Sequence, residues 1–185
     1  MTLANRASTT PPDLLGWRRQ AFGVGIAVFR IILGLVFLTN GLSKVGFDFP
    51  VLPGFLINYD GAKGILANNI QDHPVGVYKD FVQNVILDNY TPFGILLTVT
   101  ELAVGVMLVS GAFTNVGALI GAGSILHINF STLDGWHTGP WAWEEAPLWG
   151  GLILLAIIGA GRYYGLDPRV TAMLPPRLRR WPLSS

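Results

Sequence analysis

Residues 29–44 read FRIILGLVFLTNGLSK, and this stretch decides the fold class. It lies in an apolar run from Ala21 to Leu42, which is long enough to cross a bilayer as a helix. Arg30 lies in the middle of that run, where a charged side chain is costly unless it is paired. The stretch therefore predicts a membrane-spanning helix and raises the question of what Arg30 contacts.

The composition of the whole chain agrees with a membrane protein. Of its 185 residues, 51% are hydrophobic and only 12% are charged, about half the charged fraction of an ordinary soluble domain. The chain has no cysteine, which excludes disulfides, thiolate metal sites, iron–sulfur clusters and covalently attached haem. The three histidines and the loop acids show no metal-ligand spacing, so we expect no metal site. The expected surroundings are the lipid bilayer, with no nucleic-acid partner.

Four apolar segments have the length of membrane spans, and helical geometry is required because lipid offers the backbone no hydrogen-bond partners. They cover residues 22–42, 91–110, 113–130 and 146–163. The sequence therefore predicts an all-α protein with a four-transmembrane-helix bundle. The expected organisation is an N-terminal tail (1–20), the membrane domain (21–168) and a basic C-terminal tail (169–185).

The loop between the first two predicted spans, residues 43–90, is long. Two of its segments, 61–71 and 75–89, carry apolar residues at helical spacing. The residues expected on one side of the second segment are Val77, Phe81, Val85 and Ile86. This pattern predicts short helices that either lie along the membrane interface or pack as a cap over the bundle.

The distribution of basic residues predicts the topology. Arginines gather in the two tails, whereas aspartate and glutamate collect in the loops between the spans. Cytoplasmic loops carry an excess of lysine and arginine, and four spans place both termini on one side. We therefore expect both termini in the cytoplasm, the long loop outside, and the first span as a retained signal-anchor.

Glycines share helix faces with the two intramembrane charges. Arg30 lies on a stripe with Gly34 and Gly41, and Glu101 lies on a stripe with Gly105. Small residues let helices approach closely, so both faces are expected to point into the bundle. Counted from the outer ends, the two charges lie at similar depths, which predicts an interhelical ion pair between Arg30 and Glu101. Such a pair serves either as a staple between helices or as the polar floor of a ligand site.

A second polar group follows in the third predicted span. Ser124 and His127 lie on one face, close to a tryptophan-rich loop that contains Trp136, His137 and Trp141. One interpretation is a pocket for a quinone headgroup, with His127 donating to a carbonyl oxygen. The other is an interfacial histidine beside an ordinary tryptophan belt.

Three motifs together resemble the DoxX/DoxD family of small bacterial and archaeal membrane proteins. They are the pattern R-x-x-x-G-x-x-F-x-x-x-G-x-x-K from Arg30 to Lys44, Glu101 with the glycine-rich run after it, and GAGRYYGLD at 159–167. The resemblance covers roughly residues 24–168 and implies a four-helix bundle in a prokaryotic cytoplasmic membrane. The matching polar residues are Arg30, Lys44, Glu101, Arg162 and Asp167, and the resemblance assigns no catalytic role to any of them.

DoxD members of this family are the membrane subunit of thiosulfate:quinone oxidoreductase. The resemblance therefore implies a membrane anchor in a quinone-linked redox complex, with quinone as the expected cofactor and with protein partner subunits. This chain has no redox-active side chain, so an enzymatic role is expected only as a subunit. The alternative is a non-catalytic accessory subunit packed against a larger respiratory or photosynthetic complex.

Overall fold

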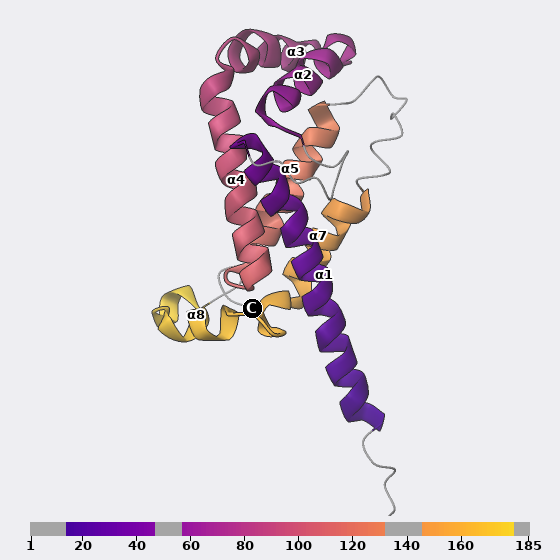
Figure 1. The fold of residues 1–185 in the computed structure, drawn as a ribbon, viewed down its shortest axis with the longest axis vertical. Coiled ribbons are helices and arrows are strands. Elements are labelled where there is room, and N and C mark those ends of the chain that lie inside the picture. The colour runs from indigo at the N-terminus through magenta and orange to yellow at the C-terminus, as the bar shows by residue number, and fades with distance from the viewer. Residues whose placement is uncertain (1–13, 47–56, 132–145, 180–185) are drawn as a thin grey trace, which may run out of the picture.

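The computed structural model describes residues 14–46, 57–131 and 146–179, and this part of the chain is helical and contains no strand (Figure 1). The all-α prediction is therefore confirmed. The elements are α1 (Leu14–Lys44), α2 (Tyr59–Asn69), the 3-10 helix η1 (Ile70–Asp72), α3 (Gly76–Phe81), the π-helix η2 (Val82–Leu87), α4 (Tyr90–Ser110), α5 (Thr114–Ser131), α7 (Ala146–Ile158), the 3-10 helix η3 (Ala160–Arg162), α8 (Asp167–Met173) and the 3-10 helix η4 (Pro176–Leu178).

The long helices form a bundle in which α1 packs along α4, α5 packs along α7, and α4 also contacts α5. The short helices α2 and α3 lie across one end of the bundle, and α8 projects sideways at the other end (Figure 1). We call these the outer end and the inner end. The buried core between the long helices is formed by Leu33, Phe37, Val104, Leu108, Ala118, Ala122, Leu152 and Leu155.

Glycines set the contact between α1 and α4. A Cβ atom on Gly41 would lie 2.8 Å from the side chain of Leu102, and one on Gly34 would lie 2.8 Å from the backbone nitrogen of Val109. A Cβ on Gly105 would lie 2.6 Å from the backbone nitrogen of Leu38. These glycines face the neighbouring helix as the sequence predicts, and their close contacts fix the register of the two antiparallel helices.

Two of the described helices are long and apolar enough to cross a membrane: Gly16–Lys44 and Tyr90–Ser110. In each, only 33% of the most apolar window is buried, so most of that surface faces outward. The fourth predicted span, residues 146–163, forms the shorter helix α7, which ends at Ile158 instead of Tyr163. It ends there because Gly159 adopts a left-handed conformation (φ 62°) and a 3-10 turn follows. Helix α1 begins at Leu14, eight residues before the predicted start.

Both segments predicted to be helical in the long loop are helical, as α2 with η1 and as α3 with η2. We call these four elements the cap. The cap packs against α4, and Ile70 and Val82 in it are fully buried. Val77, Phe81 and Val85 are exposed, whereas Tyr78 and Ile86 turn toward the bundle. The cap therefore covers the outer end and still presents an apolar side to its surroundings.

Candidate functional site

A buried ion pair lies near the outer end of the bundle. Lys44, the last residue of α1, donates a hydrogen bond from Nζ to Oε1 of Glu101 at 2.9 Å, and Nζ lies 2.8 Å from Oε2. The two side chains are only 3% and 11% exposed. A cation at a helix C-terminus also interacts favourably with the helix dipole, which helps to hold Lys44 in this position. The outer end of the bundle is therefore polar inside.

The predicted ion pair between Arg30 and Glu101 is wrong, because Glu101 pairs with Lys44. Gly41 packs against Leu102, and Gly34 packs against Val109 at the opposite end of α4. Arg30 lies one further helical turn toward the inner end, so it lies beyond the last turn of α4. Arg30 and Glu101 would lie at the same depth only if the outer ends of α1 and α4 were level. The glycine contacts show that the two helices are offset along their axes.

Arg30 is instead part of a second buried cluster at the inner end. Its Nη1 donates to the carbonyl oxygens of Ala160 at 3.0 Å and Tyr163 at 3.3 Å. The carboxylate of Asp167 accepts a hydrogen bond from the backbone nitrogen of Thr114 at 3.3 Å, and it interacts electrostatically with Arg30. These contacts join α1 to the turn between α4 and α5 and to the chain after α7.

The polar residues of the three motifs are thus divided between the two ends. Lys44 and Glu101 meet at the outer end, and Arg30 and Asp167 lie together at the inner end. Arg162 is exposed and donates to the carbonyl oxygen of Ile158.

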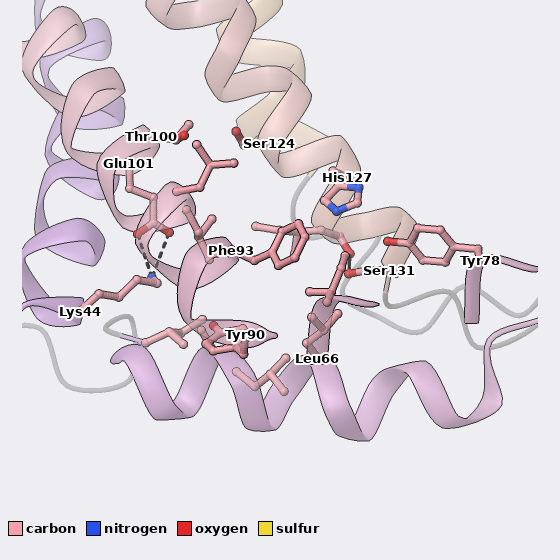
Figure 2. Close-up of a pocket in the computed structure, with 17 residues that line it drawn as sticks. Lys44, Leu66, Tyr78, Tyr90, Phe93, Thr100, Glu101, Ser124, His127 and Ser131 are labelled. Carbon is pink, nitrogen blue, oxygen red and sulfur yellow. Dashed lines mark hydrogen bonds and ion pairs between the residues drawn. The ribbon is translucent and has the colours of Figure 1, made fainter. Parts of the chain in front are cut away.

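A cavity of about 320 Å³ begins at the Lys44–Glu101 pair and extends between α4, α5 and the cap (Figure 2). This volume lies at the lower end of the range for small-molecule sites. Most of the wall is apolar or aromatic. The lining residues are Lys44, Ile57, Ala62, Ile65, Leu66, Tyr78, Ile86, Tyr90, Phe93, Leu96, Leu97, Thr100, Glu101, Ser124, His127, Ile128 and Ser131.

The end of the cavity opposite the ion pair carries Tyr78, His127 and Ser131 (Figure 2). The hydroxyl oxygen of Tyr78 is buried and has no hydrogen-bond partner among the residues that the structure describes, and Figure 2 shows it pointing toward this end of the cavity. Burial also raises the pKa of Tyr78, so the hydroxyl keeps its proton. Within residues 14–46, 57–131 and 146–179, the site therefore contains a hydrogen-bond donor that has no acceptor.

The two serines in the cavity wall use their hydroxyl protons within α5. Ser124 donates to the carbonyl oxygen of Ile120 at 2.9 Å, and Ser131 donates to that of Ile128 at 2.8 Å. Each keeps lone pairs toward the cavity and can act there as an acceptor.

The structure places Ser124 and His127, two residues of the predicted pocket, on the wall of the same cavity as Glu101. Trp136, His137 and Trp141 lie outside the described residues. The role of Tyr78 was missed, although a signal was present. Tyr78, Val82 and Ile86 form a stripe at four-residue spacing, each one residue after a member of the predicted stripe Val77, Phe81 and Val85.

His73 attaches the cap to the bundle and was also missed. Its Nε2 lies 2.9 Å from the carbonyl oxygen of Phe130 at the end of α5. Its Nδ1 accepts a hydrogen bond from the backbone nitrogen of Val75 at 3.2 Å, so Nε2 carries the proton and donates to Phe130. The rings of His73, Tyr78 and Phe130 are also in contact, which fixes the position of Tyr78.

Comparison of the chain with family models, with curated proteins and with solved structures finds no match. The geometry of the site therefore carries the interpretation. Lys44 and Tyr78 provide donors, Glu101 provides an acceptor, and an apolar space separates the two ends. Within the described ranges, no three His, Asp or Glu side chains come together in a way that could hold a metal ion.

Proposed function

We propose that this chain is a four-span membrane protein whose cavity binds the headgroup of a quinone, as the membrane subunit of a quinone-linked redox complex. The observation that carries the proposal is the Tyr78 hydroxyl, which lacks a partner in the described part of the chain and lies at the far end of an apolar cavity from the Lys44–Glu101 pair.

The distribution of polar and apolar side chains supports a membrane location. Arg30, Glu101, Asn115 and Asp167 are buried. Large apolar side chains are exposed on the long helices, among them Val28, Ile32, Leu96, Val99, Ile120 and Ile157. A soluble protein shows few contiguous exposed apolar surfaces, and lipid accounts for this arrangement.

In this proposal α5 and α7 cross the membrane together with α1 and α4. Helix α5 has 18 residues, a length of about 27 Å. Helix α7 has 13 residues, and the chain continues through η3 to Arg162. The arginine-bearing start of α1 and helix α8 lie at the same end of the bundle (Figure 1), which supports a cytoplasmic location for both.

A quinone ring fits the chemistry of the cavity. The ring is flat and apolar, and its two carbonyl oxygens, on opposite sides, can only accept hydrogen bonds. Lys44 and Tyr78 are donors at opposite ends of the cavity, and Phe93 and Tyr90 lie in its wall between them (Figure 2). In the reduced form the carbonyls become hydroxyls, for which Glu101 is an acceptor.

The chain itself contributes binding to this function, because it has no cysteine and no motif for a redox cofactor. In a complex of the thiosulfate:quinone oxidoreductase type, a partner subunit would bind the sulfur compound and supply the electrons. The three motifs that resemble the DoxX/DoxD family support this assignment and a prokaryotic cytoplasmic membrane.

The proposal is tested by titrating the purified protein in nanodiscs with a ubiquinone analogue that has a ten-carbon tail, followed by tryptophan fluorescence. We expect saturable quenching in the wild type. Tyr78→Phe should weaken binding about 2- to 10-fold, because a neutral hydrogen bond contributes about 0.5–1.5 kcal/mol. This variant should fold normally, since the hydroxyl makes no hydrogen bond to any described residue.

Tyr164→Phe is the matched control, because Tyr164 is exposed and does not line the cavity. It should bind the analogue like the wild type. A wild-type protein that shows no saturable quenching would refute the quinone proposal. Equal affinities of the wild type and Tyr78→Phe would remove the hydroxyl from the site.

An accessory role is the second candidate, and a feature of α1 favours it. The first part of α1 extends beyond the rest of the bundle (Figure 1), and Trp17, Phe22 and Val24 are exposed there. In this alternative the extension packs against a larger membrane complex. Purification in mild detergent followed by mass spectrometry tests it: a stoichiometric large partner, together with absence of quinone binding, would favour the accessory role.

A further inference from the structure

The two ends of the cavity differ in exposure. At one end, among the described residues, the Lys44–Glu101 pair and Tyr90 are buried. Leu96 on α4 is 63% exposed although it lines the cavity, and His127 on α5 is exposed as well. Within the part of the chain that the structure describes, the cavity thus reaches the surface where α4 and α5 face each other.

The two helices are closely packed at their inner ends and leave space farther out. A short turn joins α4 and α5, and near it a Cβ on Gly117 would lie 2.8 Å from Met107. Toward the outer end, Leu97 of α4 and Ser124 of α5 line the cavity. The gap between the helices therefore widens from the turn toward the cap.

The surface around this opening is apolar. On α4, Ile95 and Val99 flank Leu96 and are exposed, and on α5, Leu126 and Phe130 are exposed near His127. Leu96 lies six residues after the start of α4, about 9 Å along the helix. In the proposed orientation this depth is within the outer half of the hydrocarbon layer.

The cap lies over the end of the cavity that faces away from the membrane. Ala62 and Leu66 of α2 and Ile86 of η2 line the cavity from this side and are not exposed, whereas Ile65 of α2 lines it and is exposed. A polar molecule that came from water past the cap would meet these apolar side chains, whereas a molecule dissolved in lipid reaches the opening between α4 and α5 directly.

We infer that the opening between Leu96 and His127 is a lateral portal to the bilayer, and that the ligand is an amphipathic lipid whose long apolar tail remains in the portal. This inference rests on the proposed headgroup site and adds the class of ligand and its route. A tail-less, water-borne compound lacks the contacts that the portal offers.

The portal is tested first by photolabelling of the wild type. The probe is a ubiquinone analogue that carries a diazirine on the fifth carbon of its tail. We expect the label on α4 and α5 peptides that contain Leu96, Val99 or His127. Labelling confined to α2 or α3, with competition by unlabelled analogue, would overturn the portal and leave the headgroup site intact.

The second test compares the ten-carbon analogue with its tail-less headgroup on the variant Leu96→Trp. We expect at least a 10-fold loss of affinity for the tailed analogue and less than a 2-fold loss for the headgroup. Val99→Trp is the matched control, because Val99 is exposed on the same helix and does not line the cavity. It should bind both probes like the wild type.

The outcomes distinguish the two proposals. If the wild type binds neither probe, the quinone site itself is refuted. If it binds both and Leu96→Trp changes neither affinity, the portal is refuted and the quinone site stands. If Leu96→Trp abolishes binding of both probes, tryptophan has filled the cavity, and the site of photolabelling decides for or against the portal.

Discussion

The two ends of this bundle both bury charged groups, but they differ in the space around them. At the inner end, a Cβ on Gly111 or Gly165 would overlap the Arg30 guanidinium, and one on Gly161 would overlap Asp167. At the outer end, Lys44 and Glu101 border a cavity of about 320 Å³. Charge burial alone therefore does not indicate a ligand site. The inner cluster holds chain segments together, whereas the outer pair has room to meet another molecule.

The difference in hydrogen bonding leads to the same conclusion. The Arg30 guanidinium donates from Nη1 to two backbone carbonyls, which the chain can offer because α7 ends one turn early at Ile158. Arg30 Nε and the Thr114 hydroxyl are buried without a partner among the described residues, but they lie in a closely packed cluster. The Tyr78 hydroxyl also lacks a partner among those residues, and it lies at a cavity. Buried polar groups usually have a hydrogen-bond partner, and because the Tyr78 side chain lines a cavity, a ligand acceptor is the simplest partner for its hydroxyl.

The largest effect is expected from removing the charge at the inner end. Arg30→Met leaves Asp167 without its buried counter-charge and should destabilise the protein by about 3–5 kcal/mol. Chemical denaturation in detergent micelles measures this change. Arg18→Met is the control, since Arg18 is exposed. If Arg30→Met retained wild-type stability and lost quinone affinity, the assignment of roles to the two ends would be reversed.

The next largest effect is expected from filling the space at the inner end. Gly161→Ala places a methyl group against the side chains of Asp167 and Thr114 and should cost about 1–3 kcal/mol. Gly123→Ala is the matched control, because no atom lies within 4 Å of a Cβ there. Thermal unfolding of the two variants measures the difference. Equal midpoints would mean that the inner cluster is more loosely packed than the structure shows.

Substitutions in the Lys44–Glu101 pair are expected to affect protein stability and quinone affinity differently. Glu101→Gln leaves Lys44 buried and unpaired, and adding Lys44→Met should restore stability, with a coupling energy of about 0.5–3 kcal/mol. The double variant should still bind the quinone analogue more weakly than the wild type. Denaturation and fluorescence titration of all four proteins give both quantities. Recovery of binding along with stability would show that the pair acts only as a staple.

The smallest effect is expected from the ionisation of Tyr78. Burial raises its pKa, so the native state resists losing this proton and the unfolded chain does not. The stability contributed is complete below about pH 10, the ordinary pKa of tyrosine, and is lost as the pH rises above it. Between pH 9 and 11, the midpoint temperature of thermal unfolding should therefore fall more steeply for the wild type than for Tyr78→Phe. Parallel curves would place the hydroxyl in contact with water.

Much of the fold could be predicted from local sequence features. Long apolar segments predicted helices that begin or end near Lys44, Tyr90 and Ser110. The helical spacing of apolar residues in segments 61–71 and 75–89 predicted the short helices of the cap. Gly34 and Gly105 predicted the faces that pack closely. The end of α7 was missed because a left-handed glycine within an apolar run has no distinct signal.

The candidate site was predictable only in part. Ser124 and His127 were selected because they are polar residues on one face of an apolar helix, and both line the cavity. Tyr78 was missed because its segment carries two adjacent apolar stripes, Val77–Phe81–Val85 and Tyr78–Val82–Ile86, and periodicity alone does not say which of them faces the bundle. The partner of Glu101 was assigned wrongly because two cations on α1 lay at compatible helical positions.

The sequence by itself determined that this chain is helical, has apolar segments of membrane-spanning length and places charges within them. These properties depend on each segment alone, on its length, its composition and its internal backbone hydrogen bonds. Only the tertiary structure decided that Glu101 meets Lys44 while Arg30 meets the carbonyls after α7. That choice depends on the offset between α1 and α4, which is set by glycine contacts between residues far apart in the chain.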